Sequence, residues 1–301
     1  VKNLISLDAK VHVCGAVDGG GSGSFILGEL RRLGADCSGV FKERSRISSR
    51  KTRILSSDTN QQILRVDRES VHPISQEIEK KILAFVGSRI GSVRCLILSD
   101  YLKGVLTKTL AGGVIACARR RKVPVIVDPK GRDCTKYRNA TVITPNRREA
   151  EALLGTRIID EETLLKAGRG LLAKAGTDAI LITLGKDGMA FFQKGKKTVR
   201  IPAVKKEVFD VTGAGDSVVS LLGLGYATGL DPMTSIELAN AAAGIVVGKI
   251  GTATATRREI IDDFMHRHEP KSDKVVDLPR LVRLAEPVSY THLTLPTIYS
   301  V

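Results

Sequence analysis

The sequence predicts an α/β protein with a mostly parallel sheet that is covered by helices on both faces. Short apolar runs are typical of buried strands, and they occupy residues 93–98, 123–127, 140–144 and 179–184. Apolar residues at helical spacing lie before or between these runs, at residues 74–86, 106–120 and 161–175. Strands that alternate with helices along a chain favour a parallel sheet packed between helices.

Residues 32 to 68 follow a different pattern, in which short apolar runs alternate with polar ones, as in "SRKTRILSSDTNQQILRVDRE". This alternation predicts edge strands or a small lid over the sheet. We expect the lid strands within residues 38–70.

The composition favours a globular protein with anionic partners. The 301 residues suffice for one large α/β domain or two small ones, and 43% of them are hydrophobic. A net charge of +15 favours nucleic acid or phosphorylated metabolites as partners. Aromatic residues make up only 4% of the chain and tryptophan is absent, so platforms for stacking bases are poor. No apolar run reaches the roughly 18 residues of a membrane span.

The five cysteines are far apart and form no CxxC pair; they are Cys14, Cys37, Cys95, Cys117 and Cys134. This spacing favours small buried side chains over metal ligands or disulfides. A reducing cytoplasm is the simplest setting for such a protein.

A polar cluster follows each of the four predicted strands. The clusters are "SDYLKG" (residues 99–104), "DPKG" (128–131), "TPNRRE" (144–149) and "TLGKDG" (183–188). Open α/β sheets bind ligands at the carboxyl ends of their strands, so the four clusters together predict one site. The alternative interpretation is that loops are polar without being functional.

The segment "DVTGAGDSVVSLLGLGYA" (residues 210–227) predicts an anion site at the start of a helix. Glycines allow a phosphate to approach the backbone, and the first N–H groups of a helix attract negative charge. Asp216 would lie in the first turn, where a carboxylate can act as general base on a hydroxyl. Phosphoryl transfer needs this combination of positioning and charge stabilisation. The alternative is a glycine-rich turn with an aspartate that caps the helix.

The segment "PNRREAEALLG" has two interpretations. It reads as a capping box, with Asn146 as the N-cap residue, Glu149 three residues later and Gly155 after the end of the helix. It also matches a nucleotide-site motif of the family described next, and the two roles are compatible.

These strings together resemble the ribokinase-like (PfkB) carbohydrate kinases. "DVTGAGD" is similar to the C-terminal signature of that family. "NQQILRVDRE", "LILSDYLKGVL", "VIVDPKGRDCTKYRNATVITPNRREAEALLG" and "NAAAGIVVGKIGTAT" resemble the kinase domain of the bacterial heptose 7-phosphate kinase / heptose 1-phosphate adenylyltransferases, up to about residue 265. The resemblance implies a three-layer α/β/α sandwich with a small β lid.

The resemblance also implies roles for individual residues. Asp216 would be the catalytic base, and Glu149 would help to hold Mg²⁺, directly or through water. The implied anion hole consists of Gly213, Ala214 and Gly215. The implied ATP-binding residues are Asn146, Arg147, Arg148, Glu149, Thr183, Gly185, Lys186, Gly188, Asn240 and Gly244. The implied residues for the sugar phosphate are Asp100, Lys103 and Lys130. For these positions the alternatives are a strand-end turn, tight helix packing and solvated lysines.

The implied reaction transfers phosphate from ATP to the anomeric O1 of D-glycero-β-D-manno-heptose 7-phosphate, on the route to ADP-heptose and lipopolysaccharide. The implied cofactors are Mg²⁺ with ATP and a monovalent cation such as K⁺. The implied partners are ATP, a sugar phosphate and a second copy of the chain, with neither nucleic acid nor membrane. Another sugar or nucleoside kinase is one alternative, and a non-catalytic nucleotide- or nucleic-acid-binding protein, which the positive charge supports, is another.

The chain departs from that family at both ends. We expect a kinase domain over residues 1–285 that lacks the first strand and the Gly-Gly-Ala-Asn type sugar motif of the family. The next loop also differs, with "VDGGGSG" at residues 17–23. Residues 286–301 resemble translated adapter sequence and are left out of the predicted fold, with a disordered or strand-swapped tail as the alternative.

Overall fold

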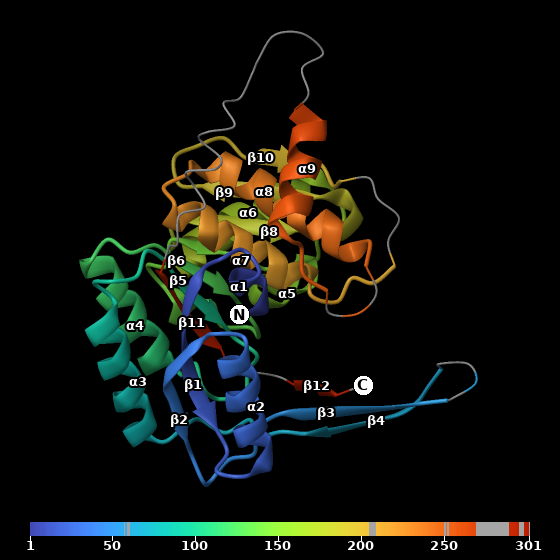
Figure 1. Cartoon of the computed structure of the whole chain (residues 1–301). Helices are drawn as coiled ribbons and strands as arrows, with labels where there is room; N and C mark the ends of the chain where they lie inside the picture. Colours follow the sequence, from blue (N-terminus) through green and yellow to red (C-terminus); the bar gives the residue numbers. More distant parts are fainter. Residues whose placement is uncertain are drawn as a thin grey trace.

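A mostly parallel sheet forms the centre of the computed structural model (Figure 1), which describes residues 1–56, 58, 61–204, 209–249, 251, 253–268, 289–294 and 298–300. Within these residues the sheet has nine strands in the spatial order β10 (Val199–Ile201), β9 (Met189–Gln193), β8 (Ala179–Thr183), β7 (Val142–Ile143), β6 (Val125–Asp128), β5 (Leu96–Ser99), β11 (Ser289–Thr294), β1 (Lys10–Val17) and β2 (Asp36–Lys42). Strands β5 to β8 coincide with the four predicted strands and pair in parallel, so this prediction is confirmed. Strands β9 and β10 turn back and pair antiparallel.

Helices cover both faces of the sheet. One face carries α3 (Gln76–Arg89), α4 (Lys108–Arg120), α5 (Arg147–Leu154) and α6 (Glu161–Ala175). The other face carries α1 (Lys2–Ile5), α2 (Gly21–Arg32), α7 (Ala214–Ala227), α8 (Pro232–Val247) and α9 (Arg257–His268). The predicted helices at 74–86, 106–120 and 161–175 are therefore confirmed as α3, α4 and α6.

Successive side chains of the central strands alternate between the two helical layers. In β5, Leu96 and Leu98 pack under α3 and α4, whereas Ile97 packs on the side of α7. This alternation follows from the two-residue period of a strand, and it makes the strands apolar throughout because both faces are buried. Cys14, Cys95 and Cys134 are buried, and burial raises the pKa of each of these thiols.

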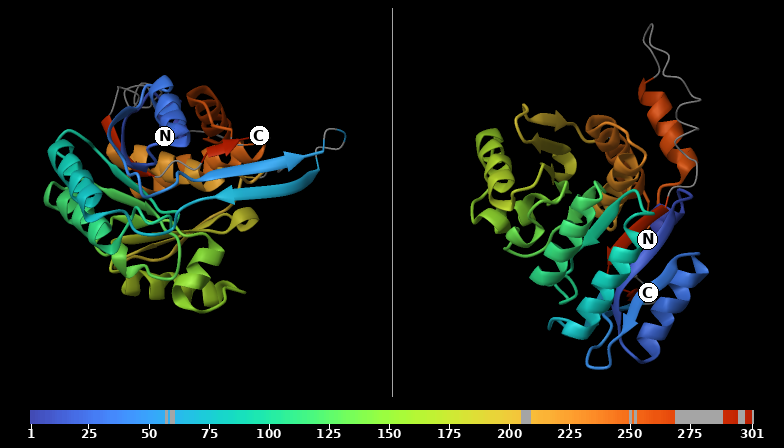
Figure 2. Two further views of the ribbon diagram at one scale, coloured as in Figure 1. Left: turned by 90° about the horizontal axis from the view of Figure 1, so that it is seen from below. Right: turned by 90° about the vertical axis from the view of Figure 1, so that its left-hand side faces the viewer.

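A second, small sheet projects from the body as a long hairpin (Figure 2). It consists of β3 (Arg50–Leu55) paired antiparallel with β4 (Gln62–Arg68), and β12 (Ile298–Ser300) runs parallel to β3. Every residue of β4 is exposed, as expected for strands that cover a site instead of filling a core. The hairpin occupies the region in which the sequence predicts lid strands, and we call it the lid hairpin.

Part of the C-terminal tail, which the fold prediction left out, lies in the central sheet. Strand β11 lies between β1 and β5 and pairs in parallel with both, so this part of the tail is inside the central sheet. Strand pairing uses backbone N–H and C=O groups, so two strands separated by one strand width can accept almost any extended segment between them. The sequence pattern also gave no indication of β1, whose apolar run precedes the region of clear alternation.

None of the described helices is long and apolar enough to cross a membrane.

Candidate active site

The N-terminus of α7 lies at the carboxyl ends of the parallel strands. Gly213 is its N-cap residue and has φ of 84°, a left-handed conformation that glycine adopts without steric cost. The apolar face of α7 packs beside β5 and β6. The carboxylate of Asp210 accepts hydrogen bonds from the N–H groups of Thr212 (2.9 Å) and Gly251 (3.2 Å) and so fixes the preceding loop.

The first turn of α7 presents backbone N–H groups at the surface. The N–H of Ala214 donates to the carbonyl of Val211 at 3.3 Å. In the part of the chain that the structure describes, the N–H groups of Gly213 and Gly215 have no acceptor. Such groups at the positive end of a helix dipole attract anions, so the turn can hold a phosphate.

Asp216 is exposed in the same turn and accepts a hydrogen bond that the sequence does not predict. The hydroxyl of Tyr101 donates to Oδ1 of Asp216 at 3.1 Å. Tyr101 follows β5 and lies 115 residues from Asp216 in the chain, so only the fold brings them together. Its place in the polar cluster "SDYLKG" is the only sequence signal for it.

Asp100 is buried beneath Tyr101, and both of its carboxylate oxygens are engaged. Oδ1 accepts from the N–H of Leu102 (2.8 Å), and Oδ2 accepts from the hydroxyl of Tyr137 (2.5 Å) and contacts Nζ of Lys136. Burial raises the pKa of Tyr137 and the Asp100 carboxylate raises it further, so this hydroxyl keeps its proton. These contacts fix the β5–α4 loop; the sugar-binding role of Asp100 remains a prediction.

The capping box at α5 is confirmed. The Asn146 side chain accepts from the N–H of Glu149 (3.0 Å), while Oε2 of Glu149 accepts from the N–H of Asn146 (2.8 Å). Gly155 ends the helix in the left-handed conformation. The other oxygen of Glu149 forms an ion pair with Lys130, so Lys130 joins the β6 and β7 strand ends.

Asp128, at the end of β6, is a second residue to which the sequence analysis assigned no role. Burial raises the pKa of Asp128 to about 7; Lys130 opposes this shift, and the carboxylates of Glu149, Asp216 and Asp100 add to it. Carboxylates from β5, β6, α5 and α7 thus converge, which explains why one of them keeps its proton. A strongly shifted carboxyl group at strand ends is typical of a functional site.

The β8–β9 connection lies next to the start of α5. Thr183 forms an isolated bridge with Asn146, and Gly185 and Lys186 continue into the short 3₁₀-helix η2 (Gly185–Asp187). A Cβ on Gly188 would meet the carbonyl oxygen of Ile201 at 2.0 Å, so only glycine fits there.

The two arginines that are predicted to bind the nucleotide differ in their contacts. Arg147 donates to Oδ2 of Asp187 at 2.6 Å and thereby ties α5 to η2, whereas Arg148 is exposed. Lys186 is also exposed. Contacts of Arg147, Arg148 and Lys186 with the nucleotide remain predictions.

The two predicted residues of α8 lie against the segment after β10. The amide of Asn240 donates to the carbonyl of Pro202 at 2.8 Å, and a Cβ on Gly244 would approach Cβ of Val204 within 2.8 Å. These contacts agree with the packing interpretation of both residues. Binding of adenine by Asn240 and Gly244 remains a prediction.

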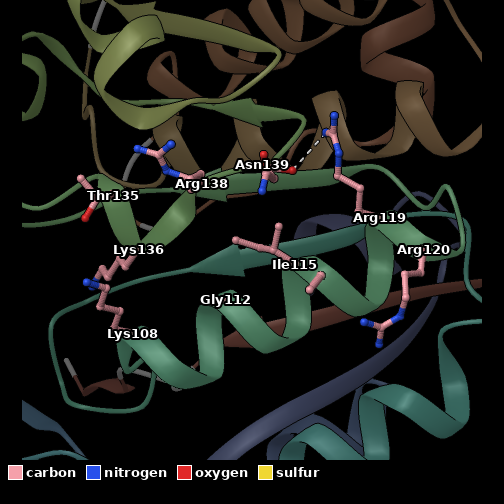
Figure 3. Close-up of a pocket in the computed structure, with 10 residues that line it drawn as sticks. Lys108, Gly112, Ile115, Arg119, Arg120, Thr135, Lys136, Arg138 and Asn139 are labelled. Atoms are coloured by element: carbon pink, nitrogen blue, oxygen red, sulfur yellow. Dashed lines mark hydrogen bonds between the residues drawn. The ribbon is translucent and has the colours of Figure 1, made fainter.

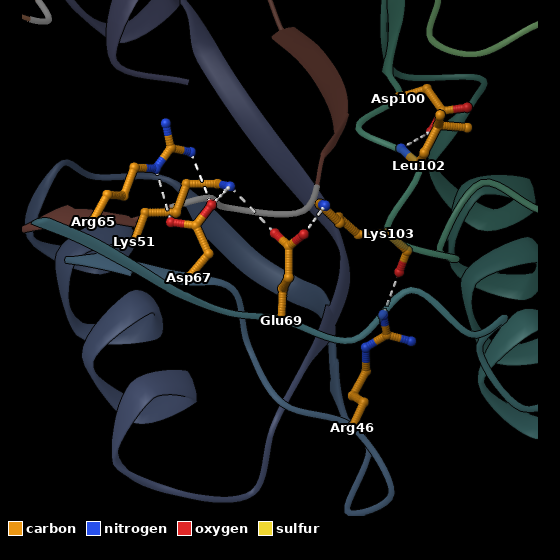
Figure 4. Close-up of polar contacts among 8 residues, drawn as sticks. All are labelled: Arg46, Lys51, Arg65, Asp67, Glu69, Asp100, Leu102 and Lys103. Atoms are coloured by element: carbon orange, nitrogen blue, oxygen red, sulfur yellow. Dashed lines mark hydrogen bonds and ion pairs between the residues drawn. The ribbon is translucent and has the colours of Figure 1, made fainter. Parts of the chain in front are cut away.

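Lys103 connects the β5–α4 loop to the lid hairpin (Figure 4). Its Nζ forms an ion pair with Glu69, which also contacts Lys51 of β3 at 3.3 Å. Nζ of Lys51 pairs with Asp67 of β4 at 2.9 Å. The lid hairpin is therefore held over the strand ends by a chain of alternating charges.

The carboxylates at the strand ends suit a Mg²⁺ ion that is shared with phosphates. Within the described residues, no three His, Cys, Asp or Glu side chains lie close enough together to hold a metal. Mg²⁺ usually needs only one or two carboxylates when waters and substrate phosphates complete its shell. Asp128 and Glu149 would supply these. Burial, with a smaller contribution from the neighbouring carboxylates, raises the pKa of Asp128, and a divalent cation would favour its charged form.

The sequence matches a known family over most of its length. The family model of the pfkB family carbohydrate kinases matches residues 1–258. The bifunctional protein HldE of Geobacter metallireducens is 46% identical over 284 residues, which are 94% of this chain and 58% of that protein. HldE of Desulfatibacillum aliphaticivorans is 46% identical over 260 residues, or 86% of this chain and 53% of that protein. The chain thus spans little more than half the length of these relatives.

Solved structures share the fold. Phosphofructokinase-2 from Escherichia coli in complex with potassium superimposes with a TM-score of 0.75 at 14% identity, covering 88% of this chain and 85% of that chain. Ribokinase from Arabidopsis thaliana complexed with ribose and ATP gives a TM-score of 0.70 at 19% identity, covering 87% and 85%. The architecture is the ribokinase-like α/β sandwich expected from the sequence.

Proposed function

The chain belongs to the pfkB family of carbohydrate kinases, and we propose that its acceptor is D-glycero-β-D-manno-heptose 7-phosphate, which it phosphorylates with ATP at the anomeric O1. The observation that carries the proposed chemistry is the position of Asp216, exposed beside the unpaired N–H groups of Gly213 and Gly215. The choice of heptose rests on the identity of 40–46% to bifunctional HldE proteins. The product would serve ADP-heptose and lipopolysaccharide synthesis.

In this proposal Asp216 takes the proton from the anomeric hydroxyl as that oxygen attacks the γ-phosphorus of ATP. The bond between this phosphorus and the β,γ-bridging oxygen breaks, and ADP leaves. Tyr101 donates to Oδ1 and so leaves Oδ2 of Asp216 to face the acceptor. The N–H groups of the first turn of α7 stabilise the charge on the transferred phosphoryl group. Mg²⁺, when bound with ATP, neutralises the charge of the β- and γ-phosphates.

The remaining residues bind and enclose the two substrates. ATP would lie along α5, η2 and α8, where the predicted nucleotide residues are found. The lid hairpin would cover the acceptor, and Lys103 would exchange its contact with Glu69 for the acceptor's phosphate. The exposed Ile54, Ile63 and Leu64 of the lid hairpin support a homodimer. A cytoplasmic location and activation by K⁺ are part of the same proposal.

Release of ADP with a panel of acceptors tests the proposal. Heptose 7-phosphate, fructose 6-phosphate, ribose and adenosine are compared at saturating ATP and Mg²⁺, with and without K⁺. We expect the highest kcat/KM for heptose 7-phosphate. A higher value for another acceptor would retain the kinase but reject heptose, and ATP binding without turnover on any acceptor would reject both.

A further inference from the structure

A cavity lies beside α4 (Figure 3). Helices α4 and α7 pack on opposite faces of the sheet. The volume of the cavity is about 590 Å³, within the range of pockets that bind small molecules. It is lined by Lys108, Gly112, Ile115, Ala116, Arg119, Arg120, Thr135, Lys136, Arg138 and Asn139. The lining comes from one side of α4 and from the segment around the 3₁₀-helix η1 (Thr135–Tyr137).

The lining contains five cationic residues and no acidic one. Arg119 is neutralised by Asp178 at 2.9 Å, and Lys136 by Asp100. Asp133, beside the cavity, is close enough to Lys108 and Lys136 for electrostatic attraction without a direct contact.

The other three cations of the lining, Lys108, Arg120 and Arg138, have no ion-pair partner among the residues that the structure describes. The cavity therefore retains a positive charge that an anionic ligand would neutralise.

The cations are divided between two ends of the cavity. Lys108 and Lys136 lie near the start of α4, while Arg119 and Arg120 lie near its end (Figure 3). Eleven residues of helix separate the Cα atoms at these ends by roughly 16 Å. Because Lys and Arg side chains are long and flexible, their charged groups can approach one another more closely than their Cα atoms do, as the shorter spacing of two phosphates on one sugar requires. The floor between them is uncharged, and a Cβ on Gly112 would meet no atom within 4 Å, so the space above it is open. This layout fits a molecule with two anionic groups on an uncharged frame.

We propose that this cavity binds a sugar bisphosphate as an effector, separately from the catalytic site. The class of ligand follows from the cavity; its identification with the product of the reaction, a heptose 1,7-bisphosphate, rests on the proposed function. The cavity reaches the catalytic site through a short chain of contacts. Lys136 lines the cavity and contacts Asp100, and the next residue, Tyr101, donates to Asp216. A phosphate that draws Lys136 away from Asp100 would loosen this loop and lower turnover.

Binding of fructose 1,6-bisphosphate, measured by calorimetry, tests the site without requiring catalysis. Gly112→Leu would fill the cavity, and leucine favours a helix interior more than glycine does. Gly87→Leu is the matched control, because Gly87 lies on α3 and a Cβ there also meets no atom within 4 Å. We expect Gly87→Leu to bind like the wild type and Gly112→Leu to bind at least ~10-fold more weakly, with neither melting temperature below that of the wild type. Equal binding by both variants would overturn the proposal.

A charge-matched pair of variants separates a specific site from general attraction. Arg120→Gln with Arg138→Gln removes two cavity cations, and Arg94→Gln with Arg169→Gln removes two exposed cations that do not line the cavity. Each lost charge-assisted contact should weaken binding by about 10-fold or more, so only the first pair should show a large loss. An equal loss in both pairs would mean non-specific attraction and reject the site.

Turnover provides the test of coupling. We expect fructose 1,6-bisphosphate to lower kcat of the wild type and of Gly87→Leu but not of Gly112→Leu. Inhibition that persists in Gly112→Leu and is relieved by excess acceptor would place the ligand in the catalytic site instead. Binding in the cavity without any change in kcat would retain the site and reject its link to Asp216. Absence of turnover in every variant would count against the proposed function, whereas the calorimetry would still decide the cavity.

Discussion

The strand ends and the lid hairpin approach the same site but are stabilised by different forces. We call residues 99–104, 128–131, 144–149 and 183–188 the strand-end floor. It stands on β5, whose four residues are all buried, whereas every residue of β4 in the lid hairpin is exposed. Apolar burial fixes the floor, and ion pairs among Lys51, Asp67, Glu69 and Lys103 hold the lid hairpin.

This difference corresponds to two tasks: the floor positions the catalytic groups, and the lid hairpin encloses the substrates. Catalytic groups need a fixed geometry, which packed strands and buried hydrogen bonds provide. A cover must open for substrates. The ion pairs of the lid hairpin are partly buried, and among the described residues no apolar core supports the hairpin, so these contacts can break at lower cost than a packed layer can. The predictions below compare the two regions, beginning with the largest expected effect.

Asp216→Asn should lower turnover by roughly 10²- to 10⁴-fold while ATP binding is retained, because the amide cannot accept the proton. Steady-state ADP release and ATP titration on the same preparation measure the two effects. Glu69→Gln in the lid is the comparison and should change KM for the sugar phosphate more than kcat. An unchanged rate in Asp216→Asn would remove this residue from the mechanism.

Asp100→Ala should destabilise the floor by about 3–5 kcal/mol, since it leaves the buried Lys136 ammonium and Tyr137 hydroxyl without their acceptor. Glu69→Ala removes the contacts with Lys103 and Lys51, but the side chains of the Lys103–Glu69 pair are 17% and 23% exposed, so both lysines can regain water and the loss should be smaller, about 1–2 kcal/mol. Denaturant titrations of both variants measure the contrast. Equal losses would mean that the lid is as rigidly held as the floor.

Asp128→Asn should change how stability depends on pH. The pKa of Asp128 rises from 3.8 to about 7 on folding, so the folded state holds this proton more tightly than the unfolded state. The favourable contribution is complete below pH ~4 and is lost as the pH rises through about 7. The variant should therefore gain stability relative to the wild type between pH 4 and 8, by at most ~4 kcal/mol. A constant difference across this range would contradict the shifted pKa.

Tyr101→Phe should lower kcat about 5-fold, with KM for ATP unchanged, because Asp216 loses one donor and its fixed orientation. Initial rates over a range of ATP and acceptor concentrations separate kcat from the two KM values. An unchanged kcat would leave Tyr101 without a positioning role.

The central strands, three helices and the start of α7 could be predicted because their signals are local. Buried parallel strands are apolar at every position, and the Asn146–Glu149 capping box and the glycine turn at Gly213 are short motifs with a known geometry. The four polar clusters also follow their strands directly, so their place at one sheet edge follows from parallel pairing.

Contacts between distant segments could not be predicted in the same way. The Tyr101–Asp216 hydrogen bond depends on how α7 packs beside β5, and the shifted pKa of Asp128 depends on burial and on three other carboxylates. The position of β11 between β1 and β5 uses backbone groups that every sequence has, so no side-chain pattern indicates it. The cavity beside α4 is equally invisible in the sequence, because its cations come from two separate segments.

Phosphorus NMR of a mixture of this chain with ATP, Mg²⁺ and heptose 7-phosphate tests the central claim most directly. The account predicts a new resonance from an anomeric phosphate, coupled to the proton on C1, that grows with ADP and grows at least ~100-fold more slowly when Asp216→Asn replaces the wild type. Formation of ADP with inorganic phosphate alone, or of a phosphate ester at another hydroxyl, would contradict the account.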